Sequence, residues 1–191
     1  RNTALLDISV GDQVRQARAV ARESLVAFMQ DRLTTLVRDQ GHSAQEVDAV
    51  LSLKSVRLPE VVQRLVAVRT FAELPEAAAL AAANKRIANI LKKSESKPAE
   101  HVVPALLVEP AERALHDALL AIAPRADELF EEGQYTQSLR ELAALKAPVD
   151  AFFDAVMVNA DDEKLRANRL ALLARLHRSM NRVADLSKLA T

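Results

Sequence analysis

Arginine residues near the end of the chain are well suited to bind a phosphate backbone. Arg175, Arg178 and Arg182 are spaced by three and four residues, which predicts one shared face of a helix. A guanidinium group pairs with phosphate oxygens through parallel hydrogen bonds, so such a row can follow a nucleic-acid strand. The alternative is a solvated face of a bundle helix, because charges at this spacing also face water.

A second basic cluster lies near the middle of the chain. Lys85 and Arg86 precede Lys92 and Lys93 in one predicted helix. Cations stabilise the C-terminal end of a helix, which accounts well for Lys92 and Lys93 but less well for the other two. Lys85 and Arg86 are therefore candidate contacts to nucleic acid.

Aromatic side chains offer a place to stack an unpaired base. Phe152 and Phe153 are adjacent, so at most one of them can lie fully on the core face of a helix. The other, or the single tyrosine, Tyr135, could stack on a base. Packing in the core is the alternative for each of them.

Arg169 differs from the other arginines because it projects into the leucine face of the last predicted helix. A buried guanidinium must be paired, since an uncompensated buried charge is costly. Asp150 or Asp154 on the neighbouring helix are the expected partners. A contact to RNA is the alternative.

No constellation of residues in the chain supports catalysis. The chain has 0 Cys, its 4 His are scattered, and its 3 Gly are too few for a phosphate-binding loop. No serine lies in a nucleophile motif. We expect no catalytic residue, no metal site and no cofactor in this chain.

The composition predicts an all-α protein. Of the 191 residues 50% are hydrophobic, and Ala and Leu, which favour helices, predominate over the 3 Gly and 7 Pro. The formal net charge of +0 does not by itself indicate a nucleic-acid partner. The longest Ala-rich apolar run, 77–83, is too short to span a membrane. The chain begins with Arg1, so we expect a fragment of a longer protein.

Apolar periodicity and capping signals place the helices. The predicted helices are 14–37, 43–53, 59–68, 77–93, 110–131, 134–145 and 149–158, with a last helix from about 163 to 186. The Ser- and Pro-containing segment 94–104 predicts a boundary between a helical region, 1–99, and a second domain, 100–191. Four helices with short connections make the second domain an antiparallel bundle.

Several strings of residues, taken together, resemble one family. They are Ala81–Leu91 with its Asn-Lys-Arg, Val103–Glu112, Phe130-x-x-Gly133-x-Tyr135, Val149–Val158, Leu165–Leu173 and Val183–Ser187, with Phe28–Leu33 and Val47–Leu51 upstream. In this order they resemble the C-terminal third of bacterial glycyl-tRNA synthetase beta subunits. The resemblance covers essentially the whole chain.

The resemblance implies an all-helical anticodon-binding domain, similar to that of arginyl-tRNA synthetases, over about 100–191. The family is an α2β2 ligase that joins glycine to its tRNA with ATP and magnesium in the cytoplasm. Its adenylate chemistry belongs to the alpha subunit, so this chain would bind glycine tRNA without an active site of its own. Glycine anticodons share two cytosines, whose amino groups need hydrogen-bond acceptors.

The resemblance also implies functional residues. Arg166, Asn168 and Arg169 match the family's Arg-x-Asn-Arg-Leu string, whereas Asn159 stands where an apolar residue is expected. The predicted tRNA-binding residues are Lys85, Arg86, Tyr135, Arg166, Asn168, Arg169, Arg175, Arg178 and Arg182. The alternative function is a helical scaffold for protein–protein contacts, which an exposed apolar face over 77–83 would favour.

Overall fold

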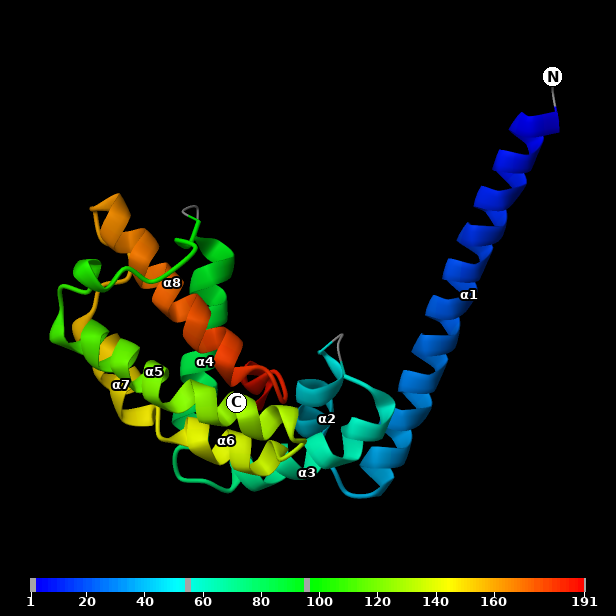
Figure 1. Cartoon of the computed structure of the whole chain (residues 1–191). Helices are drawn as coiled ribbons and strands as arrows, with labels where there is room; N and C mark the ends of the chain where they lie inside the picture. The colour runs from blue at the N-terminus through cyan, green and yellow to red at the C-terminus, as the bar shows by residue number, and fades with distance from the viewer. Residues whose placement is uncertain (1–2, 54–55, 95–96, 191) are drawn as a thin grey trace. The chain divides into compact units, whose positions relative to one another are not determined.

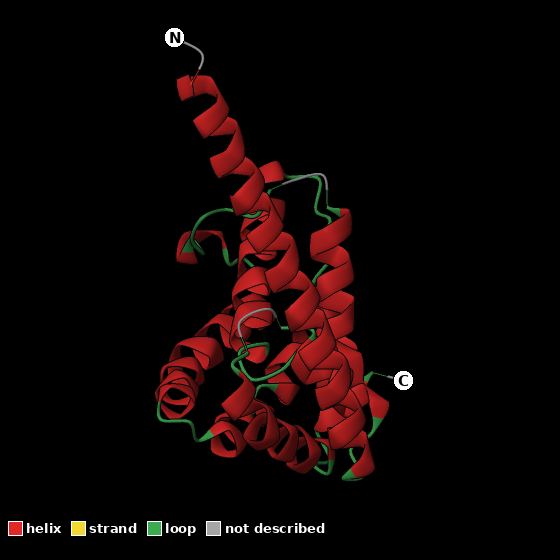
Figure 2. Ribbon diagram, turned by 90° about the vertical axis from the view of Figure 1, so that its right-hand side faces the viewer, coloured by secondary structure: helices red, strands yellow, loops and turns green. Residues whose placement is uncertain are grey.

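The structure, a computed structural model, describes residues 3–53, 56–94 and 97–190. All regular elements in these residues are helices, so the predicted all-α class is confirmed (Figures 1 and 2). The contacts divide the chain into two units, Arg1–His42 and Ser43–Thr191. The first unit is dominated by one long helix, α1 (Thr3–Asp39), which is longer than the predicted helix 14–37.

The second unit contains the remaining elements. Its α-helices are α2 (Ala44–Leu51), α3 (Val61–Ala72), α4 (Ala77–Lys93), α5 (Pro110–Glu131), α6 (Tyr135–Ala143), α7 (Lys146–Ala155) and α8 (Glu163–Met180). Short 3-10 helices are η1 (Leu58–Glu60), η2 (Pro104–Leu106) and η3 (Leu186–Leu189).

Local signals set several helix ends as predicted. Ser43 and Glu46 form a reciprocal capping box that begins α2, with 3.1 Å from the Glu46 N–H to the Ser43 hydroxyl. Gly133 ends the turn after α5 with a φ of +74°, a left-handed conformation that favours glycine. The N–H of Gln134 then donates to the carbonyl of Leu129 at 2.8 Å, which closes the helix end.

Several helix bounds differ from the prediction; for example, α3 runs to Ala72 instead of 68 and α7 ends at Ala155 instead of 158. Helix α8 ends at Met180 instead of near Leu186, because the Asn181 side chain accepts from the Leu186 N–H at 2.9 Å and turns the chain. Helix α7 begins at Lys146, three residues before the predicted start, with Pro148 inside its first turn. The turn after Met180 removes Arg182 from the helical face on which it was predicted to lie.

The second unit has one core that includes helices from both sides of residue 99. Helix α4 packs against α8, α7 and η3, and α3 packs against α6 (Figure 1). Leu80 and Ile87 of α4 are as fully buried as Leu172 and Leu176 of α8. The predicted boundary at 99/100 therefore lies inside the second unit.

Candidate nucleic-acid interface

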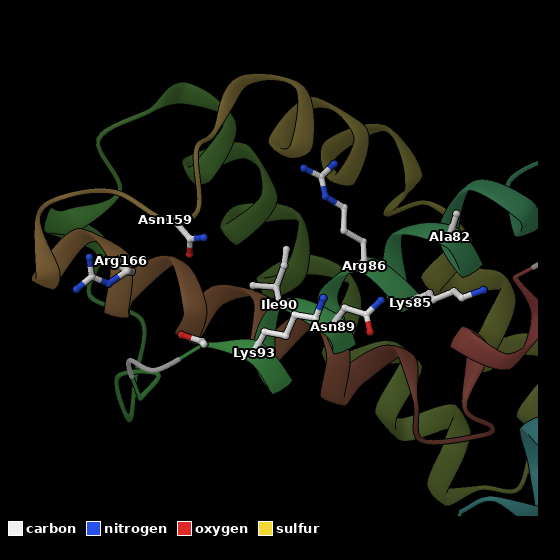
Figure 3. Close-up of a pocket in the computed structure, with 9 residues that line it drawn as sticks. Ala82, Lys85, Arg86, Asn89, Ile90, Lys93, Asn159 and Arg166 are labelled. Carbon is white, nitrogen blue, oxygen red and sulfur yellow. The ribbon is translucent and has the colours of Figure 1, made fainter.

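A groove of about 830 Å³ runs along α4 toward the segment that joins α7 to α8 (Figure 3). Its polar lining comes from three elements: Lys85, Arg86, Asn89, Lys93 and Ser94 at α4, Asn159 in the connection, and Arg166 on α8. No acidic residue lines it within the described part of the chain. The groove thus brings together three predicted residues, Lys85, Arg86 and Arg166.

The position of α4 explains why these cations face solvent. Asn84 and Ile87 lie on its buried side, and Asn84 is held by a reciprocal amide pair with Asn181 at 2.8 and 3.0 Å. Lys85 and Lys93 are eight residues apart, a little over two turns, so both emerge along the exposed side. Lys85 also reaches the carbonyl of Ala190 at 3.4 Å.

Arg86 lies over an aromatic ring beside the groove. Its guanidinium carbon is 4.2 Å from the centroid of Phe153, and in Figure 3 its side chain extends from α4 toward α7. Phe152 is fully buried and Phe153 is only half-buried, as the adjacency of the two residues predicted. The half-buried ring therefore remains close to the groove.

The N-terminus of α8 fixes Arg166. The Asp162 carboxylate caps the helix by accepting from Leu165 and Lys164, and these backbone hydrogen bonds lower the pKa of Asp162. Arg166 donates to the carbonyl of Ala160 at 2.7 Å and has a further interaction, so its guanidinium is not free. It contributes a positioned positive charge at the end of the groove.

Asn168 and Arg169 have internal partners. Asn168 is buried and hydrogen-bonds both the N–H and the carbonyl of Val103, at 2.7 and 3.2 Å. These bonds hold the segment between α4 and α5 against α8. Arg169 pairs with Glu112 at 2.7 Å and donates to the Met157 carbonyl. The expected partners of Arg169, Asp150 and Asp154, were wrong, because the first turn of α5 places a buried carboxylate closer.

Tyr135 and Arg182 lie in another cluster, around Arg64. The Arg64 guanidinium stacks over the rings of Phe130 and Tyr135 at 5.1 and 4.8 Å and donates to the carbonyls of Arg182 and Val183. It also holds Glu60, and their hydrogen bond lowers the pKa of that carboxyl. Tyr135 is buried, with 7% of its surface exposed.

The positive charge of Arg182 is compensated by carboxylates of the same protein. Its guanidinium pairs with Asp127 at 2.6 Å and with Glu131, and it stacks over Phe130 at 4.1 Å. Partial burial disfavours its charge, yet the hydrogen bonds to Asp127 and then Glu131 raise the pKa of Arg182. The structure therefore separates Arg182 from Arg175 and Arg178, with which it was grouped.

Arg175 is partly exposed and Arg178 is exposed on α8. Within the described residues no carboxylate lies within 4.0 Å of either guanidinium. Arg175 follows Arg166 by nine residues, about two and a half helical turns, so the two leave α8 on opposite sides. These two arginines form a basic surface separate from the groove.

The apolar run 77–83 does not form the face that the scaffold alternative requires. Ala77, Leu80, Ala81 and Ala83 are buried in the core. Across the described ranges, no group of three or more His, Asp or Glu side chains could hold a metal ion. In those same ranges, no helix is both long and apolar enough to cross a membrane.

Comparison with known proteins relates this surface to a family. The family model described as the DALR anticodon binding domain matches residues 80–189. This chain belongs to the DALR anticodon-binding domain family. The residues that line the groove, from Ala82 to Arg166, all lie inside the matched range.

Similar proteins carry the name of the family that the sequence motifs resemble. The glycine–tRNA ligase beta subunit of Leptothrix cholodnii is 64% identical over 169 residues, 88% of this chain and 24% of that protein. The same subunit of Janthinobacterium sp. is 56% identical over 192 residues, 97% of this chain and 27% of that protein. The chain thus spans about a quarter of the length of these relatives, and the stated resemblance is confirmed.

Sequence reasoning missed part of the groove of this DALR domain. Asn159 was noted only as a departure from the family pattern, yet its side chain lines the groove. Its position in a loop without periodicity gave no signal of its neighbours on α4. Lys93, which was attributed to the preference for cations at a helix C-terminus, also lines the groove.

Proposed function

We propose that this chain is the anticodon-binding part of a glycine–tRNA ligase beta subunit and that the groove along α4 holds the tRNA. The observation that carries the proposal is the position of the groove, which is lined by cations and lies inside the region matched by the anticodon-binding family. The identity with glycine–tRNA ligase beta subunits supports the choice of tRNA.

The lining has the chemistry that an RNA loop requires. Lys85, Lys93 and Arg86 supply charge for phosphates, which gives affinity and a dependence on salt. Side-chain amides from Asn89 and Asn159 both donate and accept hydrogen bonds, and single-stranded loops expose base edges to such groups. A helical frame holds these groups at fixed separations.

The other predicted residues divide into two groups. Arg175 and Arg178 extend the basic surface of α8, and we keep them as phosphate contacts. Direct contacts from Asn168, Arg169, Tyr135 and Arg182 stay predictions, since these side chains have partners inside the protein. Through those partners they hold the surrounding elements in place.

The proposal extends to the whole ligase. The longer beta subunit would join an alpha subunit in an α2β2 enzyme of the cytoplasm, and that alpha subunit would use ATP and magnesium to activate glycine. This chain would contribute tRNA binding and no bond-making step. Because the family match begins at residue 80, the anticodon-binding domain would include α4 in addition to the predicted 100–191, with α2 and α3 supporting it.

Fluorescence anisotropy with labelled glycine tRNA tests the proposal. At moderate salt the chain should bind this tRNA more tightly than the same tRNA carrying another anticodon. Equal affinities would contradict anticodon recognition, and no binding would contradict the proposed function as a whole.

A scaffold for protein contacts is the second candidate function. Leu58, Val62 and Val66 lie four residues apart, and each of these residues is 46–50% exposed. This apolar stripe on η1 and α3 suits a helix or sheet from another part of the longer polypeptide. Binding of tRNA that is unaffected by substitutions in the groove would favour this candidate.

A further inference from the structure

Beyond Arg86 the groove continues into a second hollow, whose lining is more apolar. This second hollow, of about 520 Å³, shares Arg86, Ile90 and Asn159 with the first. The rest of its lining is apolar except for one carboxylate: Asp154, Ala155, Val156, Met157 and Val158. Met157 is 74% exposed, although burying a side chain of this size would be favourable.

An unpaired base is a flat, largely apolar ring with a polar edge, and the hollow offers a surface for each part. The Phe153 ring meets the buried ring of Phe152 edge-on, with 5.5 Å between centroids, so it is anchored to the core. Arg86 lies over Phe153 and is itself exposed, which leaves a guanidinium plane for stacking. Met157 adds a flexible apolar contact.

Besides Arg86, the polar side chains that line this hollow are Asp154 and Asn159. Within the described residues, neither the Asp154 carboxylate nor the Asn159 amide has a hydrogen-bond partner or an ion pair. A carboxylate only accepts hydrogen bonds, whereas an amide both donates and accepts. Cytosine presents an amino donor beside ring acceptors, and uracil presents a carbonyl acceptor where cytosine has the amino group.

We propose that the second hollow holds one unpaired cytosine of the RNA, with Asp154 and Asn159 as specificity-determining residues. Asp154 accepts from the cytosine amino group, Asn159 donates to a ring acceptor, and Arg86 stacks on the base. Lys85 and Lys93 hold neighbouring phosphates in the groove along α4. This inference rests on the proposed function, because it presumes that the groove binds tRNA.

The test measures discrimination between cytosine and uracil. Glycine tRNA is compared with two variants in which each anticodon cytosine is replaced in turn by uracil, using the full 191-residue chain. The unsubstituted chain should bind one of the variants roughly ten-fold more weakly than glycine tRNA. Asp154→Ala should bring that ratio close to one by weakening the binding of the cytosine tRNA.

Asp150→Ala is the matched control. Asp150 lies one turn earlier on α7, loses the same charge when substituted, and pairs with Lys146 at 2.6 Å outside the groove lining. It should keep the ratio of the unsubstituted chain. Asn159→Ala should lower the ratio in part. Asp154 and Asn159 are both exposed, so the fold is expected to be retained in each variant.

The outcomes separate the inference from the proposed function. If Asp154→Ala strengthens binding of both tRNAs equally, the carboxylate only repels phosphate and the inference is overturned. If glycine tRNA is still preferred over an anticodon-swapped tRNA in that case, the proposed function survives. If the unsubstituted chain binds all anticodon variants equally well, both the inference and the proposed anticodon recognition are contradicted.

Discussion

The buried guanidinium of Arg169 is held by the buried carboxylate of Glu112, with 2.7 Å between Nε and Oε1. The two side chains are 7% and 0% exposed, and they join α8 to the first turn of α5. Glu112 also accepts from the N–H of Glu109 at 2.8 Å, so it starts α5 as well as pairing the arginine. The pair therefore fixes how two elements of the anticodon-binding domain meet.

Arg169→Met should destabilise the fold strongly. Removing one partner of a buried pair leaves an uncompensated charge, which costs about 3–5 kcal/mol in the free energy of unfolding. The double variant Arg169→Met with Glu112→Gln should lose much less, because glutamine is neutral and keeps an acceptor for the Glu109 N–H. Urea denaturation measures both, and equal losses in the two variants would show that the charge is not the cause.

Loss of cations along α4 should weaken the binding of tRNA. Lys85→Gln with Lys93→Gln should reduce affinity by about 1–3 kcal/mol and lower the slope of affinity against salt by roughly one per lost phosphate contact. Arg140→Gln on α6 is a control, since Arg140 is exposed and lies outside the groove. An equal effect of the control would point to attraction by overall charge instead of by the groove.

The basic surface of α8 is tested without disturbing the core. Arg175→Glu with Arg178→Glu should weaken tRNA binding by about 1–3 kcal/mol if both side chains meet phosphate, and should leave the unfolding free energy unchanged. Arg182 is left intact because its ion pairs with Asp127 and Glu131 support the fold. Unchanged affinity, with the helical circular dichroism retained, would mean that these arginines form a solvated face.

Mild acid should destabilise the domain through His177. Burial lowers the pKa of His177 below its ordinary value of 6.5, and Asp185 opposes this shift in part. The folded state therefore binds fewer protons than the unfolded state. The contribution of neutral His177 to the free energy of unfolding is complete above pH 6.5 and is lost as the pH falls through the folded pKa. His177→Gln should remove this loss.

The pH dependence is followed by urea unfolding between pH 7.5 and 5. The unsubstituted chain should lose more stability across this window than the His177→Gln variant. Parallel curves for the two proteins would show that groups other than His177 account for the acid sensitivity.

The sequence predicted those features of the fold that depend on neighbours in the chain. The capping box at Ser43 and the glycine turn at Gly133 need only a few adjacent residues, and both are present. The end of α8 was placed too late because Val183 and Leu186 continue the apolar period. Their burial serves a turn and a 3-10 helix, which the side chain of Asn181 imposes.

Residues of the candidate site could be predicted only where they belong to a recognisable sequence motif. Lys85 and Arg86 stood out as a basic string, and the structure places both in the groove. Arg169 could not be assigned its partner, because Glu112 is 57 residues away in the chain and meets it only after packing. Asp154 and Asn159 lacked any local pattern, so their shared hollow follows from the fold alone.

The amide pair between Asn84 and Asn181 has a mechanical consequence for the groove. It clamps α4 one residue before Lys85, and the tail beyond it reaches Lys85 through the carbonyl of Ala190. The final ten described residues thus act as a brace behind the helix that carries the groove. Truncating this C-terminal segment would therefore leave α4 less firmly held, and the positions of Lys85, Arg86 and Lys93 less well defined, although none of these cations is removed.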